Sequence, residues 1–212
     1  MANRLNNLLF QNLANIITVI GLVLSVWLVV SALIDPECLW LITLLALFIG
    51  LSDFLDGKIA KHLKIKSSFG STLDRLRDKI FICPTLLILI YYYQEKTFQN
   101  LIVQSLTIGL VLLIIVCEIF LLFTWFYATI KKLDASSNQY GRIKMFLEFS
   151  GVMFWLISLD IEEYFFISVI TVSIYLIDIV FVFTLYYAIK SIEAYYQRYY
   201  KNRKNQAYQK TN

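Results

Sequence analysis

Charged residues are scarce in this 212-residue chain: they make up 16% of it, against about 25% in soluble domains, while apolar residues reach 59%. Two prolines and seven glycines leave little material for linkers. The single histidine, His62, excludes a histidine-rich metal site, and Cys38, Cys83 and Cys117 lie too far apart for a CxxC motif. So little polar surface cannot cover the apolar residues in water. The composition therefore indicates a protein whose solvent is lipid.

Six apolar runs are predicted to form transmembrane helices, which need roughly 17–25 residues each. The runs are 15–34, 39–55, 79–93, 101–130, 145–159 and 164–189. The third and fifth are short, so their helices are expected to extend into the polar stretches 72–78 and 139–144. Polar helical turns within the membrane are tolerated where they line a water-filled cavity. The sequence thus predicts an all-α polytopic membrane protein with six transmembrane helices around a polar cavity.

The basic residues divide unevenly between the segments that join these runs. If the N-terminus is cytoplasmic, 18 of the 19 Lys and Arg residues lie on the cytoplasmic side, and Lys96 alone lies outside. The outer turns carry mostly acids, such as Asp35 and Glu163. The positive-inside rule then predicts cytoplasmic N- and C-termini and a cytoplasm-facing cavity, in the plasma or inner membrane if the protein is bacterial. The net charge of +4 reflects this orientation and does not indicate a nucleic-acid partner.

Two terminal segments flank the six-helix domain, which is predicted to span 15–189. Residues 1–14 place leucines at helical spacing between Asn and Arg residues, which predicts an amphipathic helix lying in the cytoplasmic interface. Residues 190–212 form a basic cytoplasmic tail. Neither segment requires a chemical role.

Four carboxylates gather at the ends of two adjacent predicted helices. Asp53 and Asp56 are three residues apart, and Asp74 and Asp78 are four apart, so each pair shares a helix face. Carboxylates so placed repel one another unless cations neutralise them. Hard oxygen ligands with excess negative charge suit Mg²⁺ or Mn²⁺, and Mg²⁺ sites are often completed by substrate phosphates. The cluster therefore indicates phosphoryl chemistry.

The residues between the acidic pairs suit a phosphate ligand. Lys58, Lys61, Lys64 and Lys66 supply positive charge, Gly57 and Ala60 leave room near the backbone, and Gly70 would permit the turn back into the membrane. The alternative is a solvated cytoplasmic loop whose acids merely cap helices, since Ser71-x-x-Asp74 is similar to a helix N-cap signature.

The stretch Asp53-x2-Asp56-Gly57-x2-Ala60-Lys61-x8-Gly70-x3-Asp74-x3-Asp78 resembles the signature of the CDP-alcohol phosphatidyltransferases, D-x2-D-G-x2-A-R-x8-G-x3-D-x3-D. Every spacing agrees, and Lys61 stands where the family has arginine. Asn15-Ile16-Ile17-Thr18 is similar to the family's N-x-x-T near the first span. The resemblance is thus close in the first half of the chain and architectural in the rest.

This resemblance implies a role for each residue of the motif. Asp53, Asp56 and Asp74 would ligate two Mg²⁺ or Mn²⁺ ions, and Asp78 would lie near them and act as general base. Gly57, Ala60, Lys61 and Gly70 would hold the CDP moiety of CDP-diacylglycerol. The replacement of arginine by Lys61 keeps the charge but loses a two-pronged phosphate contact. A homodimer is also implied.

The acceptor is less well specified than the donor. Gly141-Arg142-Ile143-Lys144 looks similar to the G-[KR]-x-K stretch of phosphatidylglycerophosphate synthases, which implies that Arg142 and Lys144 bind a phosphorylated acceptor, sn-glycerol 3-phosphate. They could equally be topological anchors. Gly21, where that branch often has arginine, leaves inositol phosphate, phosphatidylglycerol or an amino alcohol open as acceptors.

Two questions outside the motif also stay open. The intramembrane acids Glu118, Glu148 and Asp178 could pair helices or line a cavity. A divalent-cation transporter or a structural scaffold is the alternative outside this enzyme class. A transporter would be expected to spread its acids over several spans.

Overall fold

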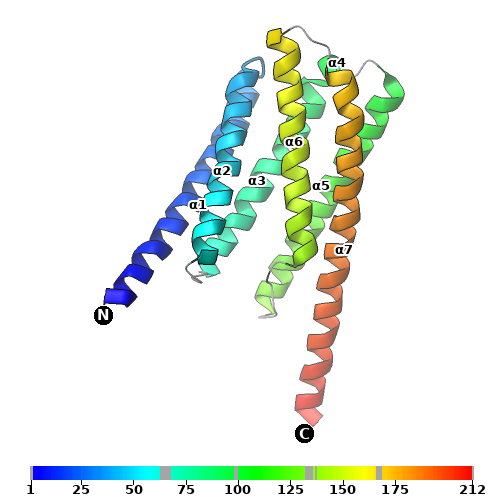
Figure 1. The fold of residues 1–212 in the computed structure, drawn as a ribbon. Coiled ribbons are helices and arrows are strands. Elements are labelled where there is room, and N and C mark those ends of the chain that lie inside the picture. The colour runs from blue at the N-terminus through cyan, green and yellow to red at the C-terminus, as the bar shows by residue number, and fades with distance from the viewer. Residues whose placement is uncertain are drawn as a thin grey trace. The chain divides into compact units, whose positions relative to one another are not determined.

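A computed structural model describes residues 2–62, 68–97, 100–131, 136, 138–165 and 169–211, and these residues are helical apart from short connections (Figure 1). The elements, in chain order, are α1 (Ala2–Ile34), α2 (Leu39–His62), α3 (Ser68–Tyr92), α4 (Gln94–Thr97), α5 (Leu101–Ile130), α6 (Gln139–Phe165) and α7 (Ile170–Thr211). The predicted all-α fold is confirmed.

Within the part of the chain that the structure describes, three helices are long and apolar enough to cross a membrane by length and composition. They contain the segments Asn15–Ile34 in α1, Leu101–Ile130 in α5 and Ile170–Tyr199 in α7, and Leu39–Leu55 in α2 is a shorter apolar helix. The expected extension of the third and fifth helices into polar sequence is also confirmed, since α3 begins at Ser68 and α6 at Gln139.

The predicted start of the last apolar run, residue 164, is wrong. Helix α6 continues to Phe165 and α7 begins only at Ile170. The physical reason is that apolar and aromatic side chains lie on both sides of this break, so the hydropathy pattern does not mark it.

The chain forms two compact units, and the boundaries between them fall between α4 and α5, inside α6 and inside α7. The first unit contains Met1–Gln99 and Val152–Ser173, and the second contains Asn100–Gly151 and Ile174–Asn212. The first unit therefore holds α1 to α4 with the motif residues, and the second holds α5 and the predicted acceptor residues.

Small side chains let α1 approach α2 and α3 closely in the first unit (Figure 1). The buried face of α1 carries Thr18, Gly21, Ser25, Leu28 and Ala32 at spacings of three and four residues. Helix pairs in membranes favour such small residues because they bring the backbones together. Helix α1 therefore packs against both α2 and α3, and the Asp53 side chain of α2 contacts Arg77 of α3.

The second unit has its own buried face on α5, formed by Thr107, Val111, Ile114, Glu118 and Leu121. Helix α6 begins with a side-chain cap: the Asn138 carbonyl oxygen accepts from the Gly141 amide at 2.6 Å. The side-chain nitrogen Nδ2 of Asn138 donates to the backbone carbonyl of Ser191 in α7 at 2.9 Å. The start of α6, which carries Arg142 and Lys144, is therefore fixed against α7.

Candidate metal and catalytic site

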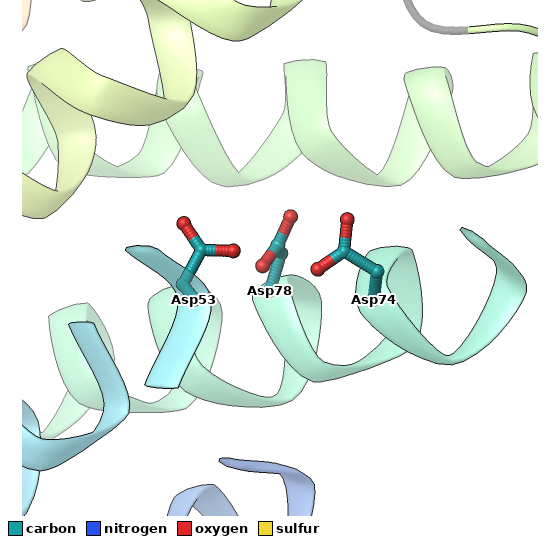
Figure 2. A group of neighbouring side chains, drawn as sticks. All are labelled: Asp53, Asp74 and Asp78. Atoms are coloured by element: carbon teal, nitrogen blue, oxygen red, sulfur yellow. The ribbon is translucent and has the colours of Figure 1, made fainter. Parts of the chain in front are cut away.

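Three of the four predicted acids come together in the first unit. Asp53 lies on α2, and Asp74 and Asp78 lie one turn apart on α3. Each offers a carboxylate oxygen, and these oxygens lie within 4.8 Å of one another. Figure 2 shows the three carboxylates gathered on one side of the two helices. The prediction that the two acidic pairs converge from neighbouring helices is therefore confirmed for Asp53, Asp74 and Asp78.

The fourth acid belongs to the same helix as the first. Asp56 lies on α2, as do Ala60 and Lys61, but the side chains of these three residues lie outside the described part of the structure. Gly57, one residue after Asp56, is exposed, and a β-carbon placed there would meet nothing within 4 Å. The α2 backbone at Gly57 is thus open to an approaching ligand, as the motif requires.

The alternative in which these acids only cap helices does not fit the helix boundaries. Helix α3 begins at Ser68, so Asp74 lies in its second turn, and Ser71 is already helical. An N-cap residue precedes the helix and has a non-helical backbone. For the same reason Gly70 does not form the turn that the sequence suggested, because it lies in the first turn of α3.

Arg77 contacts all three carboxylates and was not predicted as a site residue. Its Nη2 donates to Asp53 and to Asp74, and it lies 3.2 Å from an oxygen of Asp78. By sequence alone, Arg77 is one of the 18 basic residues that are predicted to lie on the cytoplasmic side. Its spacing three residues after Asp74, on the same helix face, was the signal that could have identified it.

The surroundings of Asp78 differ from those of an ordinary surface carboxylate. This residue directly precedes the apolar run 79–93. Burial raises the pKa of its carboxyl group from 3.8 to about 6, while the neighbouring Arg77 guanidinium opposes that rise. A bound cation would lower the pKa in the same way as Arg77 does.

The donor set fits a hard divalent cation. All three converging ligands are carboxylates, which suit Mg²⁺ and Mn²⁺, and they come from two helices that the α1 packing holds together. Asp53, Asp74 and Asp78 could hold such ions, and Asp56 lies on the same helix as Asp53.

The predicted acceptor residues Arg142 and Lys144 have different surroundings in the second unit. Arg142 is exposed and lines a surface pocket with Gln139, Ile143 and Phe146. Lys144 is buried, and its ammonium group contacts Glu118 of α5 and lies 3.3 Å from Glu148 of α6.

Two of the three intramembrane acids, Glu118 and Asp178, contact a side chain of another helix. Glu118 links α5 to α6 through Lys144. Asp178 of α7 accepts a hydrogen bond from the Thr107 hydroxyl of α5 at 2.8 Å. Both acids therefore pair helices.

The three long apolar helices are typical of a membrane protein, and the cluster of Asp53, Asp74 and Asp78 could hold a metal ion. A family model described as CDP-alcohol phosphatidyltransferase matches residues 11–189, and the chain belongs to this family. One relative is the CDP-diacylglycerol--glycerol-3-phosphate 3-phosphatidyltransferase of Aquifex aeolicus (strain VF5), 31% identical over 112 residues. That match covers 53% of this chain and 61% of the relative.

Solved structures of Mycobacterium tuberculosis phosphatidylinositol phosphate synthase share the fold. The manganese and citrate complex matches with a TM-score of 0.54 and 18% identity, covering 86% of this chain and 82% of that one. The structure with CDP-DAG bound matches with a TM-score of 0.53 and 16% identity, covering 89% and 94%.

Proposed function

We propose that this chain transfers the phosphatidyl group of CDP-diacylglycerol to a hydroxyl of sn-glycerol 3-phosphate and releases CMP. The observation that carries the proposal is the convergence of Asp53, Asp74 and Asp78 from α2 and α3, at the spacing of the family motif. The Aquifex relative supports the reaction and the acceptor, and the CDP-DAG-bound relative supports the donor.

Asp53, Asp56 and Asp74, with Asp78 beside them, would hold two Mg²⁺ or Mn²⁺ ions. When bound, such ions neutralise a pyrophosphate and stabilise the departing nucleotide phosphate. The exposed backbone at Gly57, with Ala60, Lys61 and Gly70, would hold the CDP moiety. Lys61 would offer the phosphates a single ammonium group, whereas the arginine of the family can contact a phosphate through two N–H groups.

Asp78 would act as the general base of the transfer. Its carboxylate accepts the proton of the acceptor hydroxyl, whose oxygen forms a new bond to the phosphorus that bears the lipid. The bond from that phosphorus to the CMP oxygen breaks, and CMP leaves with the electron pair. The contact of the Asp78 carboxylate with the Arg77 guanidinium group, at 3.2 Å, would help to hold the base in position.

Arg142 and Lys144 would contact the phosphate of the acceptor. The exposure of Arg142 and the surface pocket beside it support this role. Lys144 has two carboxylate neighbours, so an acceptor phosphate would compete with Glu118 and Glu148 for its ammonium group.

The membrane arrangement is part of the proposal. Six helices would cross the membrane: α1, α2, α3, α5, α6 and α7. Both termini and the carboxylate cluster would lie at the cytoplasmic side, and the distribution of Lys and Arg supports this orientation. Residues 1–14 would lie in the interface; residues 2–14 form the first part of α1. Residues 15–189 would form the catalytic domain, and residues 190–212 would form the cytoplasmic tail. The family resemblance implies that the protein would form a homodimer.

The test is an acceptor panel with the purified protein in detergent. Labelled CDP-diacylglycerol is incubated with sn-glycerol 3-phosphate, inositol phosphate, phosphatidylglycerol or serine, and CMP and the lipid product are measured. We expect CMP release that depends on glycerol 3-phosphate. CMP release with another alcohol would identify that alcohol as the acceptor and would still support the reaction class. No CMP release with any acceptor would reject the proposed enzymatic activity.

A further inference from the structure

A buried arginine lies beneath the carboxylate cluster. The Arg77 side chain is 1% exposed, whereas the side chains of Asp53, Asp74 and Asp78 are 58%, 42% and 21% exposed. The guanidinium group therefore reaches the cluster from within the helix packing, and the carboxylates keep their other side toward the surface. A cation is thus already part of this site before any ion binds.

The missing side chain of Gly21 makes room for this arginine. A β-carbon at Gly21 of α1 would lie 2.5 Å from the Ser52 hydroxyl oxygen and 2.9 Å from Cδ of Arg77. Both distances are too short, so a larger residue would force these side chains to move. The Ser52 hydroxyl donates to the Ile49 carbonyl at 2.7 Å, which holds it in this position. The α1 backbone at Gly21 therefore forms the wall along which Arg77 reaches the carboxylates.

We propose that Arg77 is a positioning residue that holds Asp53, Asp74 and Asp78 together and lowers the affinity of their cluster for divalent ions. The inference rests on the proposed metal-dependent function. A guanidinium group offers several N–H donors in one plane, so it can bind more than one carboxylate at once. It also competes with a metal ion for the same oxygens and reduces the negative potential that attracts the ion.

Two consequences distinguish this role from simple packing. Without Arg77, the carboxylates repel one another, so the metal-free protein should be less stable. Metal binding should nevertheless become tighter, because a cluster that has lost the Arg77 charge attracts a divalent ion more strongly. A residue that only filled space would lower stability without changing the metal affinity.

The experiment measures Mn²⁺ binding to the purified full-length chain in detergent, without substrates, by the loss of the electron paramagnetic resonance signal of free Mn²⁺. Arg77→Met removes the charge but keeps the length of the side chain. We expect it to lower the Kd for Mn²⁺ by about tenfold or more, since one unit charge at contact distance is lost. Arg77→Lys keeps the charge and should give an intermediate Kd. Arg198→Met in α7 removes the same charge elsewhere and should leave the Kd unchanged.

Thermal unfolding of the same variants gives an independent readout. Arg77→Met should lower the melting temperature without metal, and saturating Mn²⁺ should raise it by more than in the wild type, because a ligand that binds the folded state more tightly stabilises it more. An unchanged or higher Kd in Arg77→Met, or no Mn²⁺ binding by any variant, would overturn the proposal.

A second variant tests the same idea without touching the arginine. Gly21→Ala would normally favour a helix, but here it should displace Arg77, lower the melting temperature and tighten Mn²⁺ binding. In an Arg77→Ala background, Gly21→Ala should no longer alter the Kd, as expected for coupled residues. Gly109→Ala in α5 is the matched control, because a β-carbon there meets nothing within 4 Å. Equal effects of Gly21→Ala in both backgrounds would contradict the proposal.

The proposed function is tested separately by CMP release from the wild-type protein. Tighter Mn²⁺ binding in Arg77→Met, together with no CMP release by the wild type, would reject the function and support the role of Arg77. CMP release with an unchanged Kd in Arg77→Met would support the function and reject that role.

Discussion

The ammonium nitrogen of Lys144 lies 3.3 Å from a carboxylate oxygen of Glu148, one turn further along α6, and both side chains are buried. Glu118 of α5 contacts the same ammonium group, so one buried cation stands between two buried carboxylates. Lys144 is therefore part of the contact between α5 and α6, in addition to its proposed role toward the acceptor.

Lys144→Met should destabilise the protein, because it removes the ammonium charge that Lys144 brings to the buried Glu118 and Glu148. Removing one partner of a buried ion pair costs about 3–5 kcal/mol. Thermal unfolding in detergent should therefore show a large fall in melting temperature. The triple variant Lys144→Met, Glu118→Gln, Glu148→Gln should recover much of it. A single variant as stable as the wild type would mean that this ion-pair cluster contributes little to stability.

Removal of divalent ions should abolish CMP release. Asp53, Asp74 and Asp78 approach within 4.8 Å of one another, and Arg77 supplies only one positive charge to three carboxylates. The pyrophosphate of the donor adds further negative charge, so the complex needs additional cations. Dialysis against EDTA followed by addition of Mg²⁺ or Mn²⁺ should remove and then restore activity. Full turnover after EDTA treatment would contradict the metal-dependent mechanism.

Asp78→Asn should abolish turnover while donor binding is largely kept, because a general base acts in the chemical step. Asp53→Asn should impair both, since a lost metal ligand weakens the hold on the pyrophosphate. The measurements are CMP release and equilibrium binding of labelled CDP-diacylglycerol. Turnover of Asp78→Asn at the wild-type rate would remove the base assignment.

Much of the carboxylate cluster follows from the sequence. Spacings of three and four residues place Asp53 with Asp56 and Asp74 with Asp78 on single helix faces, and the polar start of the third helix was expected from its short apolar run. The structure adds that α3 begins at Ser68, which excludes helix capping as the reason for Asp74.

The partners of the charged residues depend on tertiary packing and were not predictable in the same way. The positive-inside rule already explains why a basic residue such as Arg77 lies on the cytoplasmic side. Its position in the sequence therefore did not require that it also contact the carboxylates. The function of Gly21 appears only when α1 packs against α2 and α3. The pairing of Lys144 with Glu118 joins residues 26 positions apart, a contact that periodicity within one helix cannot reveal.

The last prediction concerns the acceptor and the exposed Arg142. If this residue binds the acceptor phosphate, Arg142→Ala should raise the KM for glycerol 3-phosphate and leave donor affinity nearly unchanged. Hydrogen bonds to charged groups contribute about 1.5–3 kcal/mol, so the rise should be about tenfold to a hundredfold.

The measurement is steady-state kinetics with the acceptor varied at saturating donor. Arg142→Lys keeps the charge but loses the forked geometry, so its KM should lie between those of the wild type and Arg142→Ala. Arg198→Ala, which removes an arginine from α7, is the control for net charge and should leave the KM unchanged. If Arg142 is a topological anchor, both Arg142 variants should keep the wild-type KM, because the other cytoplasmic basic residues already fix the orientation. That result would favour an acceptor without a phosphate, and the acceptor panel would then identify the alcohol.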